Sequence, residues 1–213
     1  MGLQNRVTPY STIERSDARG TLMGNRGELH DGEKTIVRDR SSVKGWVCCL
    51  TEFKDRRRPL MEPGAYTVLF FLDEATALAA GHRPCATCRR ADYNAFRDAW
   101  SRAFGSRPFA KDLDNALFPE MKARLKGEPM RTATLGDLPD GAMAEAEPGV
   151  PLLLWRGRAH PWTHHGYTAP IAADPARMVR VITPSATVAV LRHGYEPRVH
   201  PSVATPVAAP GHQ

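Results

Sequence analysis

Long hydrophobic segments and abundant cysteines are both missing from this sequence. Its longest apolar run, YTVLFFL, has the length of a strand, far short of the roughly 18 to 20 residues of a membrane helix. The N-terminal stretch has no apolar core of the kind found in a signal peptide, so we expect a cytoplasmic protein. With only four cysteines in 213 residues, the chain does not depend on disulfides for its core. In the cytoplasm these cysteines are expected to be reduced thiols that are available to a metal.

Positive charge is in excess in only one part of the chain. The first 131 residues hold 23 Lys and Arg against 17 Asp and Glu, which accounts for the whole net charge of +6. Two basic runs, KDRRR at residues 54–58 and CRR at residues 88–90, concentrate this charge. Such clusters attract phosphates, so we expect a nucleic-acid partner, DNA rather than RNA; a solvated charged face is the alternative. The arginines expected to contact phosphates are Arg56, Arg57, Arg58, Arg83, Arg89 and Arg90.

The order of local patterns predicts an α+β fold. Glycine-rich turns joined by short strands are typical of the first 45 residues. Apolar and β-branched runs then alternate with helix start and stop signals, and aromatic residues recur on one face of the second helix. We expect strands at residues 45–53 and 65–72 and helices at residues 73–81, 90–104 and 113–127.

The character of the sequence changes at about residue 132. Short β-type runs, among them MVRVIT and TVAVLRHGY, are separated by Pro and Gly and predict a small antiparallel β unit. A stretch rich in Pro and Ala follows and is typical of a flexible tail. The predicted organisation is therefore a basic zinc-binding domain at residues 1–131, a β unit at residues 132–200 and a tail at residues 201–213.

The C-x-x-C formed by Cys85 and Cys88 is the strongest motif in the chain. Its tight turn lets two sulfurs reach one tetrahedral ion, and zinc then needs further Cys or His ligands from elsewhere. A thioredoxin-like redox pair would open a helix directly after a strand, whereas this motif follows a predicted helix. Zinc is therefore the expected cofactor, with Cys85 and Cys88 as two of its ligands.

Four residues compete for the other ligand positions: Cys48, Cys49, His30 and His82. Cys48 and Cys49 are neighbours in a predicted strand, so their side chains should point to opposite faces. We favour Cys49, which would share a face with Val47, and leave Cys48 as a buried apolar residue or a spare nucleophile. His30 lies in a glycine-rich turn that could approach the ion, and it is the candidate fourth ligand.

The stretch FFLDEATALAAGHRPCATCRR resembles the zinc-binding N-terminal domain of the Ada alkylation-response proteins. The resemblance covers about residues 45–96, and its most specific part is AAGHRPCATCRR. In that family four cysteines bind zinc, and one of them takes a methyl group from a DNA phosphotriester. The resemblance implies a zinc module related to DNA damage or alkylation, with Cys85 and Cys88 at the positions of the family's C-x-x-C ligands. The family's other pair is Cys-x-x-x-Cys, where this chain has adjacent cysteines. The rest of the chain is similar to bacterial proteins of uncharacterised function.

Three classes of function fit these residues, and whether the protein is an enzyme stays open. The first is a structural zinc module that binds nucleic acid. The second is an enzyme that uses either an activated cysteine such as Cys48 as alkyl acceptor or the GNRGELHD turn as a nuclease site. In a nuclease, Asn25, Arg26 and His30 would supply a base and cations, but no paired carboxylates are present to hold magnesium. The third is a non-catalytic scaffold whose arginines bind an acidic protein.

Overall fold

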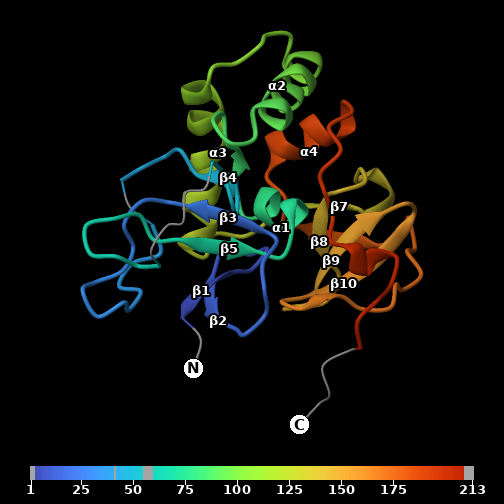
Figure 1. The fold of residues 1–213 in the computed structure, drawn as a ribbon. Helices are drawn as coiled ribbons and strands as arrows, with labels where there is room; N and C mark the ends of the chain where they lie inside the picture. Colours follow the sequence, from blue (N-terminus) through green and yellow to red (C-terminus); the bar gives the residue numbers. More distant parts are fainter. Residues whose placement is uncertain (1–2, 41, 55–59, 209–213) are drawn as a thin grey trace.

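Two six-stranded sheets and the helices between them make up the chain (Figure 1). The structure is a computed structural model that describes residues 3–40, 42–54 and 60–208. Strands predominate at the start and in the second half of this length, and helices predominate in its middle, which agrees with the predicted α+β class.

The first sheet has the strand order β2-β1-β5-β3-β4-β6. Its strands are β1 (Gln4–Val7), β2 (Ile13–Arg15), β3 (Leu22–Asn25), β4 (Val47–Leu50), β5 (Leu69–Phe71) and β6 (Arg83–Pro84). β1 pairs with β5 and β4 pairs with β6 in parallel, whereas the other neighbours are antiparallel. Because a parallel pair needs a long crossover connection, β4 reaches β6 only after the chain has formed β5 and the first helix.

Three helices follow β5, with β6 between the first and the second: α1 (Glu74–Ala79), α2 (Arg90–Phe104) and α3 (Ala110–Leu125). Asp73 caps α1 by accepting a hydrogen bond from the Thr76 backbone N–H at 2.9 Å, as its type and position predict. In α2 the aromatic face predicted from the sequence is buried at Phe96 and Trp100 and ends at Phe104, which is exposed. None of the helices in the described ranges has the length and apolar character needed to cross a membrane.

The second sheet has the order β11-β10-β9-β8-β12-β7. Its strands are β7 (Thr132–Thr134), β8 (Met143–Glu145), β9 (Pro151–Trp155), β10 (Arg158–Thr163), β11 (Gly166–Tyr167) and β12 (Met178–Val181). Each pair of neighbouring strands in this sheet is antiparallel, in agreement with the β unit expected there. Short 3₁₀ turns occur at η1 (Leu135–Asp137) and η2 (Pro201–Val203).

The run TVAVLRHGY does not form a strand, and the prediction for it was wrong. Ser185–Arg192 is a helix, α4, which packs against α2. Thr187, Val190 and Leu191 are buried and have the i, i+3, i+4 spacing of one helical face. Local β propensity is weak enough to be overridden when such a face is covered by another helix.

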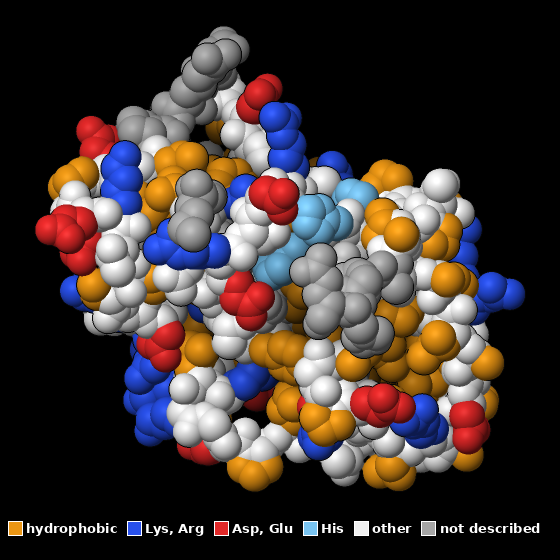
Figure 2. Space-filling view, turned by 90° about the horizontal axis from the view of Figure 1, so that it is seen from below, with side chains coloured by type: hydrophobic (Ala, Val, Ile, Leu, Met, Phe, Trp, Pro, Cys, Tyr) orange, Lys and Arg blue, Asp and Glu red, His pale blue; other side chains and the backbone are white. Residues whose placement is uncertain are grey.

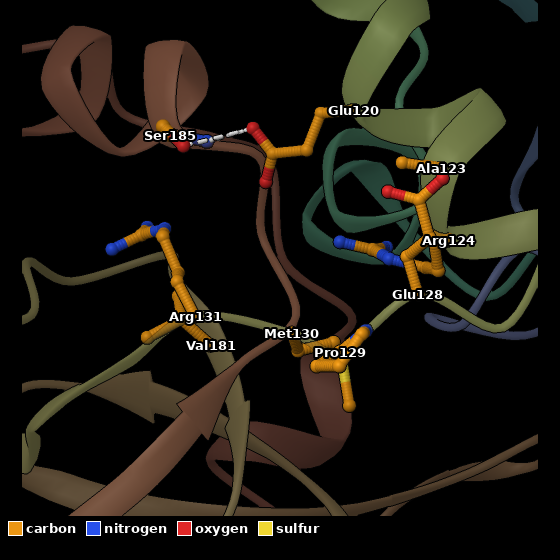
Figure 3. Close-up of a pocket in the computed structure, with 9 residues that line it drawn as sticks. All are labelled: Glu120, Ala123, Arg124, Glu128, Pro129, Met130, Arg131, Val181 and Ser185. Carbon is orange, nitrogen blue, oxygen red and sulfur yellow. Dashed lines mark hydrogen bonds between the residues drawn. The ribbon is translucent and has the colours of Figure 1, made fainter.

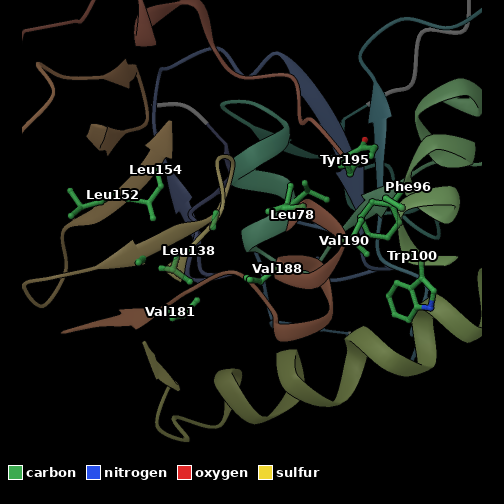
Figure 4. Packing of buried hydrophobic residues seen from close by; sticks show 14 of the residues in the cluster. Leu78, Phe96, Trp100, Leu138, Leu152, Leu154, Val181, Val188, Val190 and Tyr195 are labelled. Atoms are coloured by element: carbon green, nitrogen blue, oxygen red, sulfur yellow. The ribbon is translucent and has the colours of Figure 1, made fainter. Parts of the chain in front are cut away.

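A hydrophobic core joins the helices to the second sheet (Figure 4), while the strands of the first sheet have a separate buried cluster around Leu69 and Phe71. Leu78 of α1 and Phe96 of α2 belong to the same buried cluster as Leu152 of β9 and Val188 of α4. The boundary predicted between residues 131 and 132 therefore falls inside a shared core. The first residues of the predicted tail are also packed, since Ser202 is buried.

Candidate metal centre

The parallel pairing of β4 with β6 brings the cysteines together. Cys48 lies opposite Pro84 in the register, and the Cys85 backbone N–H donates to the Cys48 carbonyl at 2.9 Å. The next residue of β4, Cys49, therefore comes beside the start of the C-x-x-C turn. The turn closes with a hydrogen bond in which the Arg89 backbone N–H donates to the Cys85 carbonyl at 3.0 Å. This bond brings Cys88 back beside Cys85 and Cys49.

Three sulfurs meet at this edge of the first sheet. The Sγ atoms of Cys49, Cys85 and Cys88 all lie within 4.8 Å of one another, and each cysteine is partly buried. Thiolates that share one zinc ion stand about 2.3 Å from it, so the group is compact enough to hold a metal ion. In the parts of the chain that the structure describes, no further Cys, His, Asp or Glu belongs to this group.

The three thiols differ in their affinity for protons. A hydrogen bond from Cys49 lowers the pKa of Cys85 to about 4, with further help from backbone N–H donors such as that of Thr87 and against the effect of burial. The same bond, together with burial, raises the pKa of Cys49, and burial raises the pKa of Cys88. Without a metal, Cys85 is therefore the thiolate of the group, and metal binding must displace protons from the other two.

Cys48 lies on the opposite face of β4, as the strand alternation predicts. Its side chain is fully buried in a cluster with Leu69 and Phe71. Burial raises the pKa of its thiol, and the Arg89 guanidinium donates to its sulfur at 3.4 Å. A protonated and enclosed thiol is poorly placed to serve as a nucleophile.

A buried ion pair lies directly behind the C-x-x-C turn. The Arg89 guanidinium is 2.8 Å from a carboxylate oxygen of Glu74 and 2.8 Å from one of Asp92. Burial is the largest single influence and lowers the pKa of Arg89, but the charge and hydrogen bond of Glu74, together with smaller contributions from its other neighbours, raise the pKa overall. Glu74 also accepts from the Arg198 backbone N–H at 3.0 Å. The pair thus fastens the end of the turn to α1 and to the C-terminal segment.

The six arginines expected to contact phosphates have different environments. Arg89 is internal, and Arg83 is buried in a two-bond ion pair with Asp114 at 2.7 and 2.9 Å. Arg90 is exposed, and Arg56, Arg57 and Arg58 lie outside the described residues. On the face shown in Figure 2, basic and acidic side chains are interspersed with apolar ones.

The GNRGELHD residues do not share one site. Asn25 faces the cysteine group, whereas Arg26 is fully buried with its guanidinium 4.4 Å from the centre of the Trp46 ring. Burial lowers the pKa of Arg26 to about 9. The His30 ring is buried too, and its nitrogens contact the Thr67 hydroxyl at 2.6 Å and a backbone carbonyl at 3.2 Å. The structure thus places His30 apart from the cysteine group.

A pocket of about 450 Å³ opens beside the three cysteines. Apart from the cysteines, the residues that line it are uncharged: Met23, Asn25, Val43, Gly45, Val47, Leu50, Thr51, Phe53, Tyr66 and Thr87, together with Cys49, Cys85 and Cys88. Tyr66, which is 55% exposed, was not among the predicted site residues. Its only sequence signal is an aromatic residue in a Pro- and Gly-containing loop.

Comparison with known proteins adds no relative to this description. No protein-family model, curated protein or solved structure matches the chain. The likeness of residues 45–96 to the Ada zinc domain stays a prediction, and the interpretation of the site depends on its own geometry.

Proposed function

We propose that this is a zinc protein whose ion is held by Cys49, Cys85 and Cys88. The observation that carries the proposal is the convergence of three sulfurs within 4.8 Å, one from β4 and two from the turn that follows β6. Thiolates are soft ligands that select zinc among the common divalent ions of cells. The resemblance to the Ada zinc domain supports the same ion and the same C-x-x-C ligands.

The fourth coordination position would face the pocket. Structural zinc sites use four protein ligands, whereas sites that bind a water or a substrate use three, and the described residues supply three. Bound zinc would act there as a Lewis acid or as the partner of a nucleophilic thiolate. The chain's own contribution is an uncharged enclosure in which Asn25 offers an amide and Phe53 and Tyr66 offer aromatic faces.

Zinc content of matched variants tests this assignment. Elemental mass spectrometry of the purified protein should find one zinc per chain, lost in Cys49→Ser and Cys85→Ser. Cys48→Ser is the matched control because its sulfur points away from the group, and His30→Ala is a second one. Both should keep the ion. A native protein without zinc, or zinc loss in folded Cys48→Ser with retention in Cys49→Ser, would overturn the assignment.

We also propose nucleic acid as the partner of this site, with a role in DNA damage or alkylation. The excess charge of the first 131 residues supports it, as does the basic run that begins directly after Phe53. Lys54 holds its ammonium 5.5 Å from the centre of the Phe53 ring, at the margin of the pocket. Positive charge beside exposed aromatic rings is the combination that binds single strands. If a cysteine accepts an alkyl group, Cys49 is the accessible one of the adjacent pair.

Fluorescence anisotropy with labelled single-stranded DNA, duplex DNA, RNA and an acidic peptide separates the remaining classes. We expect DNA affinity that falls steeply with salt and is reduced in Arg90→Gln, with Arg158→Gln as an exposed control elsewhere. Equal binding of the acidic peptide would favour the scaffold alternative, and strand cleavage during the assay would favour the nuclease.

A further inference from the structure

A second pocket, which we call the seam pocket, lies where the helices of the first half meet the second sheet (Figure 3). Its volume is about 250 Å³. It is lined by the last turns of α3, the loop that follows them, the end of β12 and the start of α4: Glu120, Ala123, Arg124, Glu128, Pro129, Met130, Arg131, Val181 and Ser185. None of these residues belongs to the cysteine group or its pocket.

Two arginines stand on opposite sides of the seam pocket in Figure 3. The guanidinium of Arg124 donates to the Ala79 carbonyl at 2.8 Å and also to the Ile182 carbonyl. Arg131 donates to the Thr183 carbonyl at 3.4 Å. Among the residues that the structure describes, the buried Nε atoms of Arg124 and Arg131 have no hydrogen-bond partner, and neither side chain forms an ion pair. Both side chains are partly buried, and positive charge that is partly removed from water without an ion-pair partner is costly.

Of the two carboxylates of the seam pocket, one is hydrogen-bonded to the protein and the other is exposed to solvent. Glu120 accepts from the backbone N–H of Ser185 at 2.9 Å and from its hydroxyl at 2.8 Å, as the dashed lines in Figure 3 show. Glu120 therefore accepts hydrogen bonds from the first residue of α4. Glu128 is exposed to solvent, where water screens its charge. Burial lowers the pKa of Arg124 and of Arg131, and the charge of Glu120 opposes it at both, so the two arginines share one carboxylate that is already hydrogen-bonded to Ser185.

We propose that the seam pocket binds a small oxyanion, a phosphate or carboxylate group, between Arg124 and Arg131. An oxyanion accepts charge-assisted hydrogen bonds from guanidinium N–H groups and neutralises them at the same time. The volume of the pocket suits one such group with a small substituent. The site joins α3, the second sheet and α4, so an occupied pocket ties the two halves of the molecule together.

Isothermal titration calorimetry of the full chain tests the proposal, with inorganic phosphate and acetate as probes at constant ionic strength in chloride. We expect binding of phosphate, of acetate or of both, and the stronger probe identifies the group. Arg131→Gln should weaken binding at least about tenfold, while the exposed Arg158→Gln should leave it unchanged. Glu120→Gln keeps an acceptor for Ser185 but removes the competing charge, so it should tighten binding severalfold.

The Glu120→Gln variant distinguishes loss of binding from loss of folding. Replacing a residue that has only a structural role would not be expected to tighten binding. If Arg131→Gln does not fold, the result for Glu120→Gln decides alone. No heat from either probe in the native chain, native-like binding by folded Arg131→Gln, or unchanged or weaker binding by Glu120→Gln would each overturn the proposal.

Discussion

The first sheet mixes parallel and antiparallel pairs, whereas the second is built from antiparallel pairs. In the second sheet β8, β9, β10 and β11 follow one another in space as they do in sequence. In the first sheet, β4 and β6 are neighbours although β5 and α1 separate them along the chain. That non-local pair brings Cys49 to Cys85 and Cys88. The cysteine group therefore lies where distant segments meet, on a sheet with a buried cluster of its own, whereas most neighbours in the second sheet are also neighbours along the chain.

The largest effect should come from breaking the ion pair behind the first sheet's cysteine group. Arg89→Met leaves the Glu74 carboxylate buried without its cation, which is expected to lower the free energy of unfolding by about 3–5 kcal/mol. Urea unfolding of the zinc-loaded protein measures the loss. Arg107→Gln is the control: it breaks an ion pair with Asp98 in which both side chains are about half exposed, so it should cost less than about 1 kcal/mol. Equal effects of the two substitutions would contradict a special role for the buried pair.

A cavity in the second sheet should separate stability from metal binding. Leu153 of β9 is fully buried beside Met143 and Tyr167, so Leu153→Ala should lower the free energy of unfolding by about 2–5 kcal/mol. Its zinc content at 10 °C, measured on folded protein, should equal that of the native chain. Zinc loss from folded Leu153→Ala would mean that the two sheets are not separable in this way.

A smaller effect is expected from crowding the first sheet near the site. A Cβ atom on Gly24 of β3 would stand 2.4 Å from the Phe71 ring and 2.8 Å from the Val47 carbonyl. Gly24→Ala should therefore destabilise the protein by about 1–3 kcal/mol, as overpacked cores do. Gly32→Ala, where a Cβ meets nothing within 4 Å, is the matched control and should be nearly neutral in the same thermal unfolding experiment.

The smallest expected effect is the pH dependence of thiol alkylation in the metal-free cysteine group. The pKa of Cys85 is lowered to about 4, so this thiol is already ionised at neutral pH and should lose its reactivity only as the pH falls through that value. In chelator-treated protein, alkylation of Cys85 by iodoacetamide should be nearly independent of pH from about 6 to 8. Alkylation of Cys49 and Cys88, whose pKa values are raised, should be slower and rise with pH. Peptide mass spectrometry measures the three rates.

Urea-unfolded protein provides the reference for that experiment. There the three thiols should return to an ordinary pKa of about 8.5 and react alike, each faster at higher pH. Three similar rates in the folded, metal-free protein would show that the cysteines do not interact.

Local patterns were sufficient for some parts of this structure. The aromatic spacing of residues 90–104 predicted α2, and strand alternation separated Cys49 from its neighbour Cys48. The C-x-x-C motif identified the part of the site that is contiguous in sequence. Each of these features depends on residues within a few positions of one another.

Long-range contacts account for what the sequence did not reveal. No local signal shows that Glu74 will meet Arg89, or that Arg83 will pair with Asp114, and both arginines were therefore expected to face a phosphate. The residues of α4 were predicted as a strand because α2, the helix that packs against them, lies far away in the sequence. His30 was expected near the ion because its turn is rich in glycine, yet Thr67 holds its ring elsewhere.

X-ray absorption at the zinc edge tests the central claim most directly. For the native protein we expect three sulfur neighbours at about 2.3 Å and one oxygen or nitrogen neighbour at about 2.0–2.1 Å. The spectrum of His30→Ala should be the same, because that ring lies outside the cysteine group. Four sulfur neighbours, fewer than three, or a light neighbour that disappears in His30→Ala would contradict a three-cysteine centre with one position open to the pocket.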